Sequence, residues 1–183
     1  MNFQYFILYL DQVVTKFLYQ LLPHTTFFNS FFLFLSLYGN SFIIWSIIVI
    51  IAIIFEEKRH PGIQKKDVRF VITFMVSFFL TSALVLVLKE LFQRPRPFVP
   101  HLVKAISCNF DYAMPSGHAA AAIAAATVLA AFDKKRKWLY YLIAVLISFS
   151  RIYLGCHYFL DVIIGTTIGF LISKLALKLQ AKF

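Results

Sequence analysis

The sequence predicts an all-α protein, an integral membrane helical bundle with about five transmembrane helices and an N-terminal interfacial amphipathic helix. Apolar residues make up 61% of the 183 and charged residues 14%, with a mean hydropathy of +0.79. A soluble domain is about half apolar and about a quarter charged, so these values exclude one. The charged residues are also confined to short segments between long apolar runs. We expect a single membrane-embedded domain over residues 1–183, with N-terminal helices in 1–38 and the transmembrane core in 41–177.

The N-terminal segment has the pattern of an amphipathic helix. Its polar residues recur at helical spacing and leave a wide apolar face between them: Gln4, Asp11, Gln12, Thr15, Lys16 and Gln20. Such a stripe beside an apolar face is typical of a helix that lies in the membrane interface. Alternatively, the helix spans the membrane with its stripe toward the bundle, which would make six transmembrane helices. Residues 27–38 are apolar but short for a span, and we expect them to be interfacial or re-entrant.

Five later segments approach the length of a membrane span, which is roughly 20 apolar residues for ~30 Å of hydrocarbon. They cover residues 41–55, 68–88, 118–132, 138–153 and 158–177. The third is rich in alanine, and small side chains let helix backbones approach closely. We therefore expect it to be buried among the other helices rather than fully exposed to lipid.

The basic residues predict how the bundle is oriented. The net charge is +10, but the charges lie between apolar runs, which excludes a nucleic-acid-binding face. Segments 56–66, 133–137 and 174–182 are rich in Lys and Arg and alternate so that they share one face, which the positive-inside rule makes cytoplasmic. This predicts a multi-pass protein of the inner (cytoplasmic) membrane. Cys108 and Cys156 lie on the opposite, outer side, where they can form a disulfide if that side is oxidising; of the two alternatives we expect free thiols.

Three short polar islands interrupt the apolar runs on that outer side. The first, residues 89–97, offers Lys89 at a helix end and two arginines, Arg94 and Arg96, each followed by proline. Proline fixes φ and biases the preceding residue to extended geometry, so the guanidinium groups extend from a stiff segment. The arginine fork matches phosphate oxygens, and lysine adds a compact charge. Either arginine could be the phosphate ligand, and the alternative is that all three cations only snorkel to the interface.

The second island, residues 115–118, is expected to open a helix. Ser116 is a candidate N-cap, and Gly117 allows a ligand to approach the backbone closely. The free N–H groups and the positive end of the helix dipole then form an anion seat. His118 would point from the first turn toward whatever is bound there.

The third island, residues 150–161, supplies a histidine, a carboxylate and a further cation. His157 and Asp161 are four apart, so on a helix they share one face and can form an imidazole–carboxylate hydrogen bond. Such a bond fixes the tautomer and leaves the other ring nitrogen free to attack. Arg151 lies at the end of the preceding predicted helix, 138–153, and adds a third cation to Lys89 and an arginine of the first island. A metal site formed by the two histidines and Asp161 is an alternative, which the surrounding cations disfavour by repulsion.

Together the three islands resemble the three-part signature of the type-2 phosphatidic acid phosphatase family. Residues 89–97 carry Lys-x6-Arg-Pro, residues 115–118 are Pro-Ser-Gly-His, and residues 150–161 carry Ser-Arg-x5-His-x3-Asp. The resemblance favours Arg96 over Arg94 as the phosphate ligand. It says little about the first forty residues, where many members have an additional spanning helix that this chain is short of.

The resemblance implies a metal-independent lipid phosphatase with no cofactor. It implies that His157 is the nucleophile that forms a phosphohistidine, and that Asp161 orients and polarises it. By the same resemblance His118 is the general acid, which protonates the leaving alkoxide and then activates water. Five residues are expected to hold the phosphate: Lys89, Arg96, Ser116, Gly117 and Arg151. Positioning and charge stabilisation supply most of the catalysis in phosphoryl transfer, so cations can act where other enzymes use Mg²⁺.

The implied substrate is a phosphate monoester or pyrophosphate on an anionic membrane lipid, with lipid A 1-phosphate and undecaprenyl pyrophosphate as the two candidates. His101 and Lys104 are available for a second phosphate. No nucleic acid and no obligate protein partner is expected. Two other functions stay open: a phosphotransferase that passes the phosphoryl group to another lipid, and an anion or lipid transporter. A transporter function would not explain why a histidine, His157, is paired with Asp161.

Overall fold

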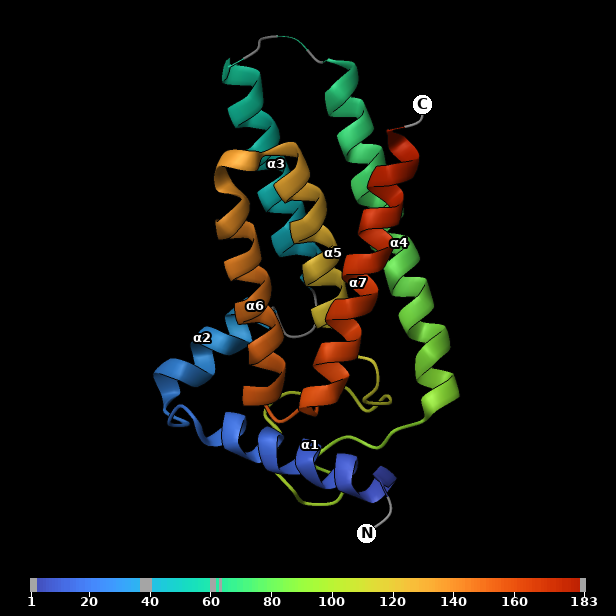
Figure 1. The fold of residues 1–183 in the computed structure, drawn as a ribbon. Coiled ribbons are helices and arrows are strands. Elements are labelled where there is room, and N and C mark those ends of the chain that lie inside the picture. The colour runs from blue at the N-terminus through green and yellow to red at the C-terminus, as the bar shows by residue number, and fades with distance from the viewer. Residues whose placement is uncertain (1–2, 37–40, 60–61, 63, 182–183) are drawn as a thin grey trace.

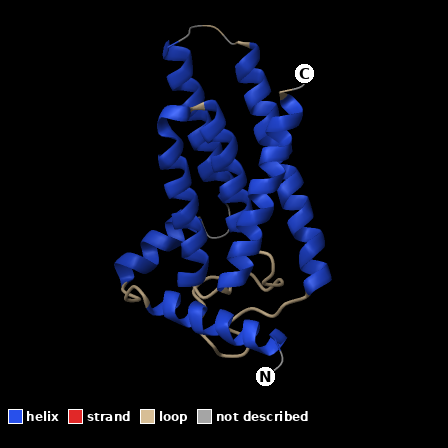
Figure 2. Cartoon of the chain, in the orientation of Figure 1, coloured by secondary structure: helices blue, strands red, loops and turns tan. Residues whose placement is uncertain are grey.

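The computed structural model describes residues 3–36, 41–59, 62 and 64–181. Five helices run side by side as a bundle, and two more lie at one of its ends (Figure 1). The bundle helices are α3 (Ser41–Arg59), α4 (Lys65–Phe92), α5 (Gly117–Phe132), α6 (Lys137–Tyr153) and α7 (Phe159–Gln180), with a short η2 (Lys134–Arg136) before α6. Figure 2 shows helices and loops and no strand among the described residues. The prediction of an all-α membrane bundle is confirmed.

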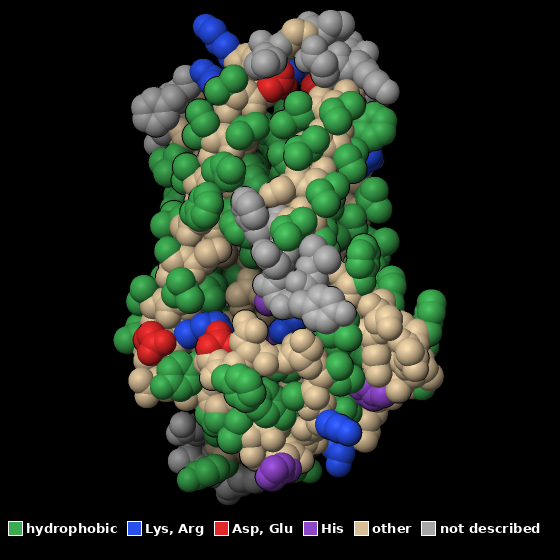
Figure 3. Space-filling view, turned by 180° about the vertical axis from the view of Figure 1, so that it is seen from behind, with side chains coloured by type: hydrophobic (Ala, Val, Ile, Leu, Met, Phe, Trp, Pro, Cys, Tyr) green, Lys and Arg blue, Asp and Glu red, His purple; other side chains and the backbone are tan. Residues whose placement is uncertain are grey.

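The lipid-facing flank of the bundle is apolar. Seen from behind, hydrophobic side chains cover most of the flank, and charged side chains gather toward the ends (Figure 3). By length and hydropathy, α4 and α7 are each sufficient to cross a membrane, whereas residues 43–56 and α5 are apolar but shorter. The five predicted spans correspond to α3–α7, with boundaries that differ by a few residues.

The helix α5 forms the centre of the bundle and packs against α4, α6 and α7. Seven of its nine alanines are buried, as the alanine-rich segment predicted, whereas Ala130 is half-buried and Ala131 is exposed. A Cβ atom added at Gly165 would lie 2.5 Å from the Ser116 carbonyl oxygen, and one added at Gly169 would overlap the Ala120 carbonyl. The backbones of α5 and α7 therefore touch, and this contact places the start of α7 against the start of α5.

The variant Gly169→Ala is expected to lower the free energy of unfolding by about 1–3 kcal/mol. The added methyl gains helix propensity, about 1 kcal/mol, but it forces the Ala120 backbone away in a packed centre. Thermal unfolding in detergent measures the effect, with Thr167→Ala on the exposed side of the same helix as control. Equal melting temperatures for the two variants would show that the helices can separate at no cost.

The two N-terminal helices lie outside the bundle. The helix α1 (Phe3–Gln20) lies across the bundle end, and α2 (Thr26–Ser36) slants beside α6 (Figure 1). Large apolar side chains of α1 are exposed, as the interfacial prediction requires, whereas Asp11 and Thr15 are buried against the bundle. The helix does not span, yet part of its polar stripe faces the protein. On α2, Phe32 packs on Tyr153 with ring centroids 4.5 Å apart, and residues 37 and 38 of the predicted interfacial segment lie outside the described residues.

The basic segments and the polar islands lie at opposite ends of the bundle. The α5–α6 connection and the C-terminal part of α7 are at one end, and the polar islands are at the end that α1 crosses (Figure 1). The ends of α3 and α4 that flank the first basic segment, 56–66, are on the same side as the C-terminus. Part of that segment lies outside the described residues. The predicted separation of basic loops from polar islands thus holds for the described part of the chain.

The expectation of free thiols is wrong, because Cys108 and Cys156 form a disulfide. The segment between α4 and α5 folds back over the bundle end, where the Ile106 N–H donates to the Leu154 carbonyl at 2.9 Å. This brings together two cysteines that are 48 residues apart in sequence. The disulfide ties the α4–α5 segment to the loop that holds His157.

Candidate active site

A cavity of about 290 Å³ opens at the bundle end where the polar islands meet. Three helices, α4, α5 and α6, contribute side chains to it, together with the α4–α5 segment and the loop before α7. Six of the eight residues predicted for the site line this cavity: Lys89, Arg96, Gly117, His118, Arg151 and His157. The other two lie just behind its wall, since the Ser116 N–H donates to the Asp161 carbonyl at 2.9 Å. Residues far apart in sequence thus converge as predicted.

Three cations of this cavity are almost fully buried. Lys89, Arg96 and Arg151 are 7%, 4% and 2% exposed. Arg96 is clamped by two backbone carbonyls, to which its Nε and Nη1 donate at 2.8 and 2.7 Å. Within the described part of the chain, Nε and Nη1 of Arg151 have no hydrogen-bond acceptor. Buried N–H donors of a charged group are costly when unsatisfied, so the cluster is suited to an anion in the cavity.

The start of α5 completes the anion seat. Ser116 occupies the N-cap position with extended backbone angles, and its hydroxyl makes no capping bond. That hydroxyl is buried and has no hydrogen-bond partner among the described residues. Gly117 lines the cavity and His118 follows it in the first turn. The free N–H groups of this turn and the positive helix end add to the attraction for an anion.

The ring of His157 is held in one orientation. Its Nδ1 lies 2.7 Å from the Ala113 carbonyl oxygen and its Nε2 lies 3.3 Å from Nη1 of Arg96. A carbonyl oxygen can only accept, so Nδ1 carries the proton and Nε2 presents a lone pair on the cavity side. Burial, and then the positive charges of Arg96 and Arg151, hold the pKa of His157 well below its ordinary value. The lowered pKa keeps the imidazole neutral near pH 7.

The predicted hydrogen bond between His157 and Asp161 is not formed. The nearest approach is 3.7 Å, from Nδ1 to Oδ2, and the Ala113 carbonyl takes the imidazole proton instead. The premise of a shared helix is wrong, because α7 begins at Phe159 and His157 precedes it. The Asp161 carboxylate accepts the N–H of Tyr158 at 2.8 Å and so caps the helix that carries it. Asp161 therefore lies beside the imidazole without a hydrogen bond to it, and its bond to the Tyr158 N–H orders the turn before α7.

The two arginines of the first island have different partners. Arg96 lines the cavity, whereas Arg94 lies behind it with Nη1 2.7 Å from Oδ1 of Asp161. Arg94 also binds Oδ2 of Asp11 at 2.5 Å, and its guanidinium stacks 3.9 Å from the centre of the Tyr158 ring. This agrees with the choice of Arg96 that the resemblance favoured. The pairing of Arg94 with the N-terminal helix was not predicted.

Asp111 is a site residue that the sequence did not reveal. Its carboxylate accepts from Nζ of Lys89 at 2.5 Å and pairs with Nη2 of Arg96. Burial alone would raise the pKa of the Asp111 carboxyl, but the hydrogen bonds from Lys89 and Arg96 lower it to about 2. The carboxylate therefore already pairs with two of the three cations that line the cavity. Its position depends on the path of the α4–α5 segment, which has no periodic pattern.

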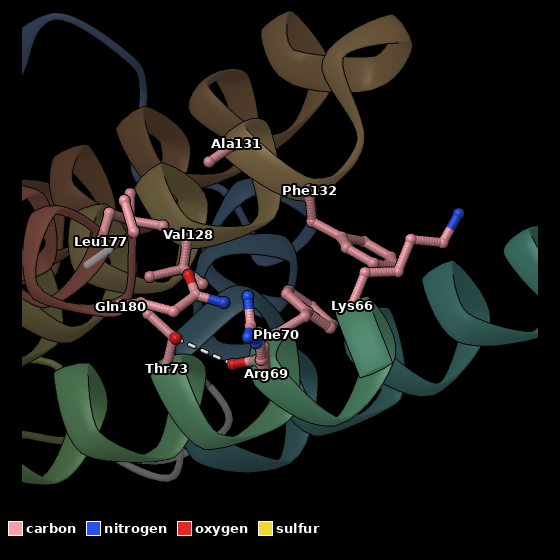
Figure 4. Close-up of a pocket in the computed structure, with 10 residues that line it drawn as sticks. Lys66, Arg69, Phe70, Thr73, Val128, Ala131, Phe132, Leu177 and Gln180 are labelled. Carbon is pink, nitrogen blue, oxygen red and sulfur yellow. Dashed lines mark hydrogen bonds between the residues drawn. The ribbon is translucent and has the colours of Figure 1, made fainter. Parts of the chain in front are cut away.

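Two other cavities in the described part of the chain lack this combination of a histidine, a carboxylate and several cations. A larger one of about 430 Å³ lies at the opposite bundle end, where Arg69 of α4 and Gln180 of α7 meet (Figure 4). None of its lining residues is a histidine or a carboxylate: Lys66, Arg69, Phe70, Thr73, Val128, Ala131, Phe132, Leu177, Gln180 and Ala181. His101 and Lys104 line a separate cavity of about 390 Å³ rather than the one with His157. No three His, Cys, Asp or Glu side chains of the described residues are grouped as a metal site.

Comparisons with known proteins show the family of this chain. The model of the PAP2 superfamily matches residues 70–183. An undecaprenyl-diphosphatase of Sulfolobus acidocaldarius is 34% identical over 154 residues, which are 84% of this chain and 71% of that protein. Phosphatidylglycerophosphatase B of Bacillus subtilis is 38% identical over 97 residues, 47% of this chain and 46% of that protein.

Two solved structures share the fold. The crystal structure of Aquifex aeolicus LpxE matches with a TM-score of 0.69 and 26% identity, covering 90% of this chain and 93% of that one. A PAP2-type phosphatidylglycerolphosphate phosphatase from Bacillus subtilis matches with a TM-score of 0.66 and 23% identity, a likeness that concerns the fold alone. It covers all of this chain and 89% of that one.

Proposed function

Since the chain belongs to the PAP2 superfamily and is a membrane lipid phosphatase, we propose that it removes the terminal phosphate of undecaprenyl diphosphate through a phosphohistidine. One observation carries the mechanism: the lone pair of His157 Nε2 faces a cavity that three buried cations share. The choice of lipid is supported by the likeness to the Sulfolobus undecaprenyl-diphosphatase, which extends over 84% of this chain. Lipid A 1-phosphate, the other substrate that the resemblance implies, is the second candidate.

In the first half-reaction, Nε2 of His157 attacks the terminal phosphorus and the bond from phosphorus to the bridging oxygen breaks. Lys89, Arg96 and Arg151 stabilise the charge on the equatorial oxygens, together with the N-terminal turn of α5. His118 donates its proton to the bridging oxygen, so undecaprenyl phosphate leaves. The His157 ring becomes an imidazolium, which Nδ1–H bonding to a backbone carbonyl and the nearby Asp161 charge stabilise.

In the second half-reaction, water replaces the departed lipid. The now neutral His118 takes a proton from that water, whose oxygen attacks phosphorus as the bond to Nε2 breaks. Inorganic phosphate leaves and His157 returns to its neutral form. The same two histidines therefore serve both steps with no net change of protonation.

The active site is proposed to face the periplasm or cell exterior from an inner (cytoplasmic) membrane. The Cys108–Cys156 disulfide lies at this end of the bundle, and disulfides persist in oxidising compartments. The opposite end carries Lys134, Lys135 and Lys137, as a cytoplasmic face does. Labelling of a cysteine introduced at Lys135 by a membrane-impermeant thiol reagent in intact cells would contradict this orientation.

Phosphate release by purified, detergent-solubilised protein tests the proposal. The panel is undecaprenyl diphosphate, lipid A, phosphatidylglycerol phosphate and phosphatidic acid, each with EDTA present. Release from undecaprenyl diphosphate with undecaprenyl phosphate as the second product is expected. Phosphate release from lipid A alone would identify lipid A as the substrate. A newly phosphorylated lipid without free phosphate would identify a phosphotransferase. Loss of activity in EDTA would overturn the metal-independent mechanism.

The variant Asp111→Asn is expected to tighten inhibition by inorganic phosphate or orthovanadate about tenfold. The native carboxylate competes with the anion for Lys89 and Arg96, and the neutral amide competes less. With a pKa of about 2 the carboxylate stays charged across the assay range, so this competition does not change with pH. Inhibition constants measure the effect, with Asp133→Asn at the opposite end as control. Weaker inhibition in Asp111→Asn would mean that the carboxylate organises the cations rather than competing for them.

A further inference from the structure

The helix α7 begins two residues after His157, and the first backbone N–H groups of α7 need hydrogen-bond acceptors from outside the helix. The first N–H groups of an α-helix have no acceptor within the helix and need one from elsewhere. Asp161 caps the N–H of Tyr158 from inside α7. The next two donors are satisfied by α1: the Phe159 N–H donates to Oγ1 of Thr15 at 2.9 Å, and the Leu160 N–H donates to Oδ1 of Asp11 at 2.8 Å. A helix from the other end of the chain thus caps α7.

The second oxygen of Asp11 extends this contact toward the active site. Its Oδ2 binds Nη2 of Arg94 at 2.5 Å, and Nη1 of the same guanidinium binds Oδ1 of Asp161 at 2.7 Å. Arg94 therefore bridges two carboxylates that would otherwise repel each other. The carboxylate of Asp161 is fixed by Arg94 on one oxygen and by the Tyr158 N–H on the other.

Asp11 and Thr15 are buried, unlike other polar residues of the stripe along α1. Asp11 is 3% exposed and Thr15 and Asp161 are 0% exposed, whereas Gln12 and Lys16 on the same helix are exposed. A helix needs only its apolar face to rest in a membrane interface. Burying a carboxylate and a hydroxyl is costly unless both are hydrogen-bonded, and here every bond goes to α7 or to Arg94. The arrangement is therefore specific docking rather than a consequence of amphipathicity.

We infer that Asp11 and Thr15 are positioning residues for the reaction, through which α1 fixes the start of α7 and the Asp161 carboxylate behind His157. This inference rests on the proposed phosphatase function. His157 and Tyr158 are the last residues before α7, so a shift of its first turn moves the nucleophile directly. The hydrogen bonds of Lys89 and Arg96 do not involve α1, and Cys156, the residue of the His157 loop whose carbonyl accepts from Arg96, is also held by its disulfide to Cys108. Loss of the α1 contacts should therefore impair the chemical step and leave phosphate binding nearly unchanged.

Two pairs of variants test the inference. Thr15→Val removes the hydroxyl with little change of shape, and Thr15→Ser restores it. Asp11→Asn keeps an oxygen for the Leu160 N–H but loses the charge that holds Arg94. We expect kcat to fall on the order of tenfold or more in Thr15→Val and Asp11→Asn, because a displaced nucleophile loses its alignment. KM and the inhibition constant of orthovanadate should stay within about twofold of wild type, and Thr15→Ser should recover most of kcat.

The controls separate this role from a general loss of stability and from failure of the proposed function. Gln12→Ala and Lys16→Gln change exposed residues of the same helix and should keep wild-type kcat and melting temperature. Unchanged kcat in Thr15→Val and Asp11→Asn, with active wild type, overturns the inference. So does a loss of kcat that follows the melting temperature and is not recovered in Thr15→Ser. If wild type releases no phosphate from any lipid, the proposed function fails, and orthovanadate affinity together with Phe159 and Leu160 amide exchange then tests the docking directly. Exchange that is unchanged in Thr15→Val overturns the docking as well.

Discussion

Replacing His157 by alanine is expected to lower kcat by a factor on the order of 10⁴ or more, because it removes the proposed nucleophile. Of the other groups that line the cavity, the Ser82 hydroxyl donates to the Phe78 carbonyl, and Asp111 is paired with Lys89 and Arg96. His118 serves as the acid in the proposed mechanism. The variant loses the hydrogen bond to the Ala113 carbonyl, which costs about 1 kcal/mol of stability and leaves the fold intact. Phosphate release and the melting temperature are measured together on the same preparation.

Two further variants sharpen this test. His157→Gln can still donate to the Ala113 carbonyl but has no nucleophilic ring nitrogen, so it should be as inactive as the alanine variant and more stable. His24→Asn changes an exposed histidine outside the cavity and should be fully active. In wild type, labelled substrate quenched in alkali should leave phosphate on the protein, since phosphohistidine survives base. Turnover by His157→Gln near the wild-type rate would assign the nucleophile to another group.

The variant Arg96→Lys is expected to lower kcat about 10²- to 10³-fold, or roughly 3–4 kcal/mol of transition-state stabilisation. The guanidinium is held by the Asp111 and Cys156 carbonyls with Nη1 directed to within 3.3 Å of His157 Nε2, where the phosphoryl oxygens must pass. A lysine keeps the charge but has one nitrogen for all of these positions. Kinetic constants and orthovanadate inhibition measure the loss, and both should worsen.

The matched comparison is Arg136→Lys at the opposite end of the bundle. Arg136 pairs with Asp133 and does not reach the cavity, so this variant should keep wild-type kinetics. A small change in Arg96→Lys, comparable to that in Arg136→Lys, would mean that charge alone suffices and that the planar fork has no special part in catalysis.

The helices and most of the cavity could be predicted because their signals are local. Apolar runs mark the spans, and the polar islands fall where those runs end, so Lys89, His118 and Arg151 meet at one bundle end once the helices pack. The alanines of α5 indicated its central place in the bundle, since small side chains let neighbouring helix backbones approach closely.

What the sequence could not predict depends on the path of the α4–α5 segment. The position of Asp111, the Ala113 carbonyl and the disulfide of Cys108 all follow from how this segment folds over the bundle end, and it has no periodic pattern. One missed feature did have a signal. An acidic residue at the third position of a helix is typical of a capping box, so Asp161 indicated that α7 begins after His157. The pairing of Arg94 with Asp11 had no signal in the sequence, because Asp11 looks like one more polar residue of an amphipathic stripe.

The central place of α5 also makes α5 and α7 depend on each other. Helix α5 has 16 residues, is mostly alanine and packs against α4, α6 and α7. The residues that receive it most closely, Gly165 and Gly169, belong to α7. A variant that lacks α7 is therefore expected to lose the packing of α5 as well, so the two helices should fold and unfold as one unit.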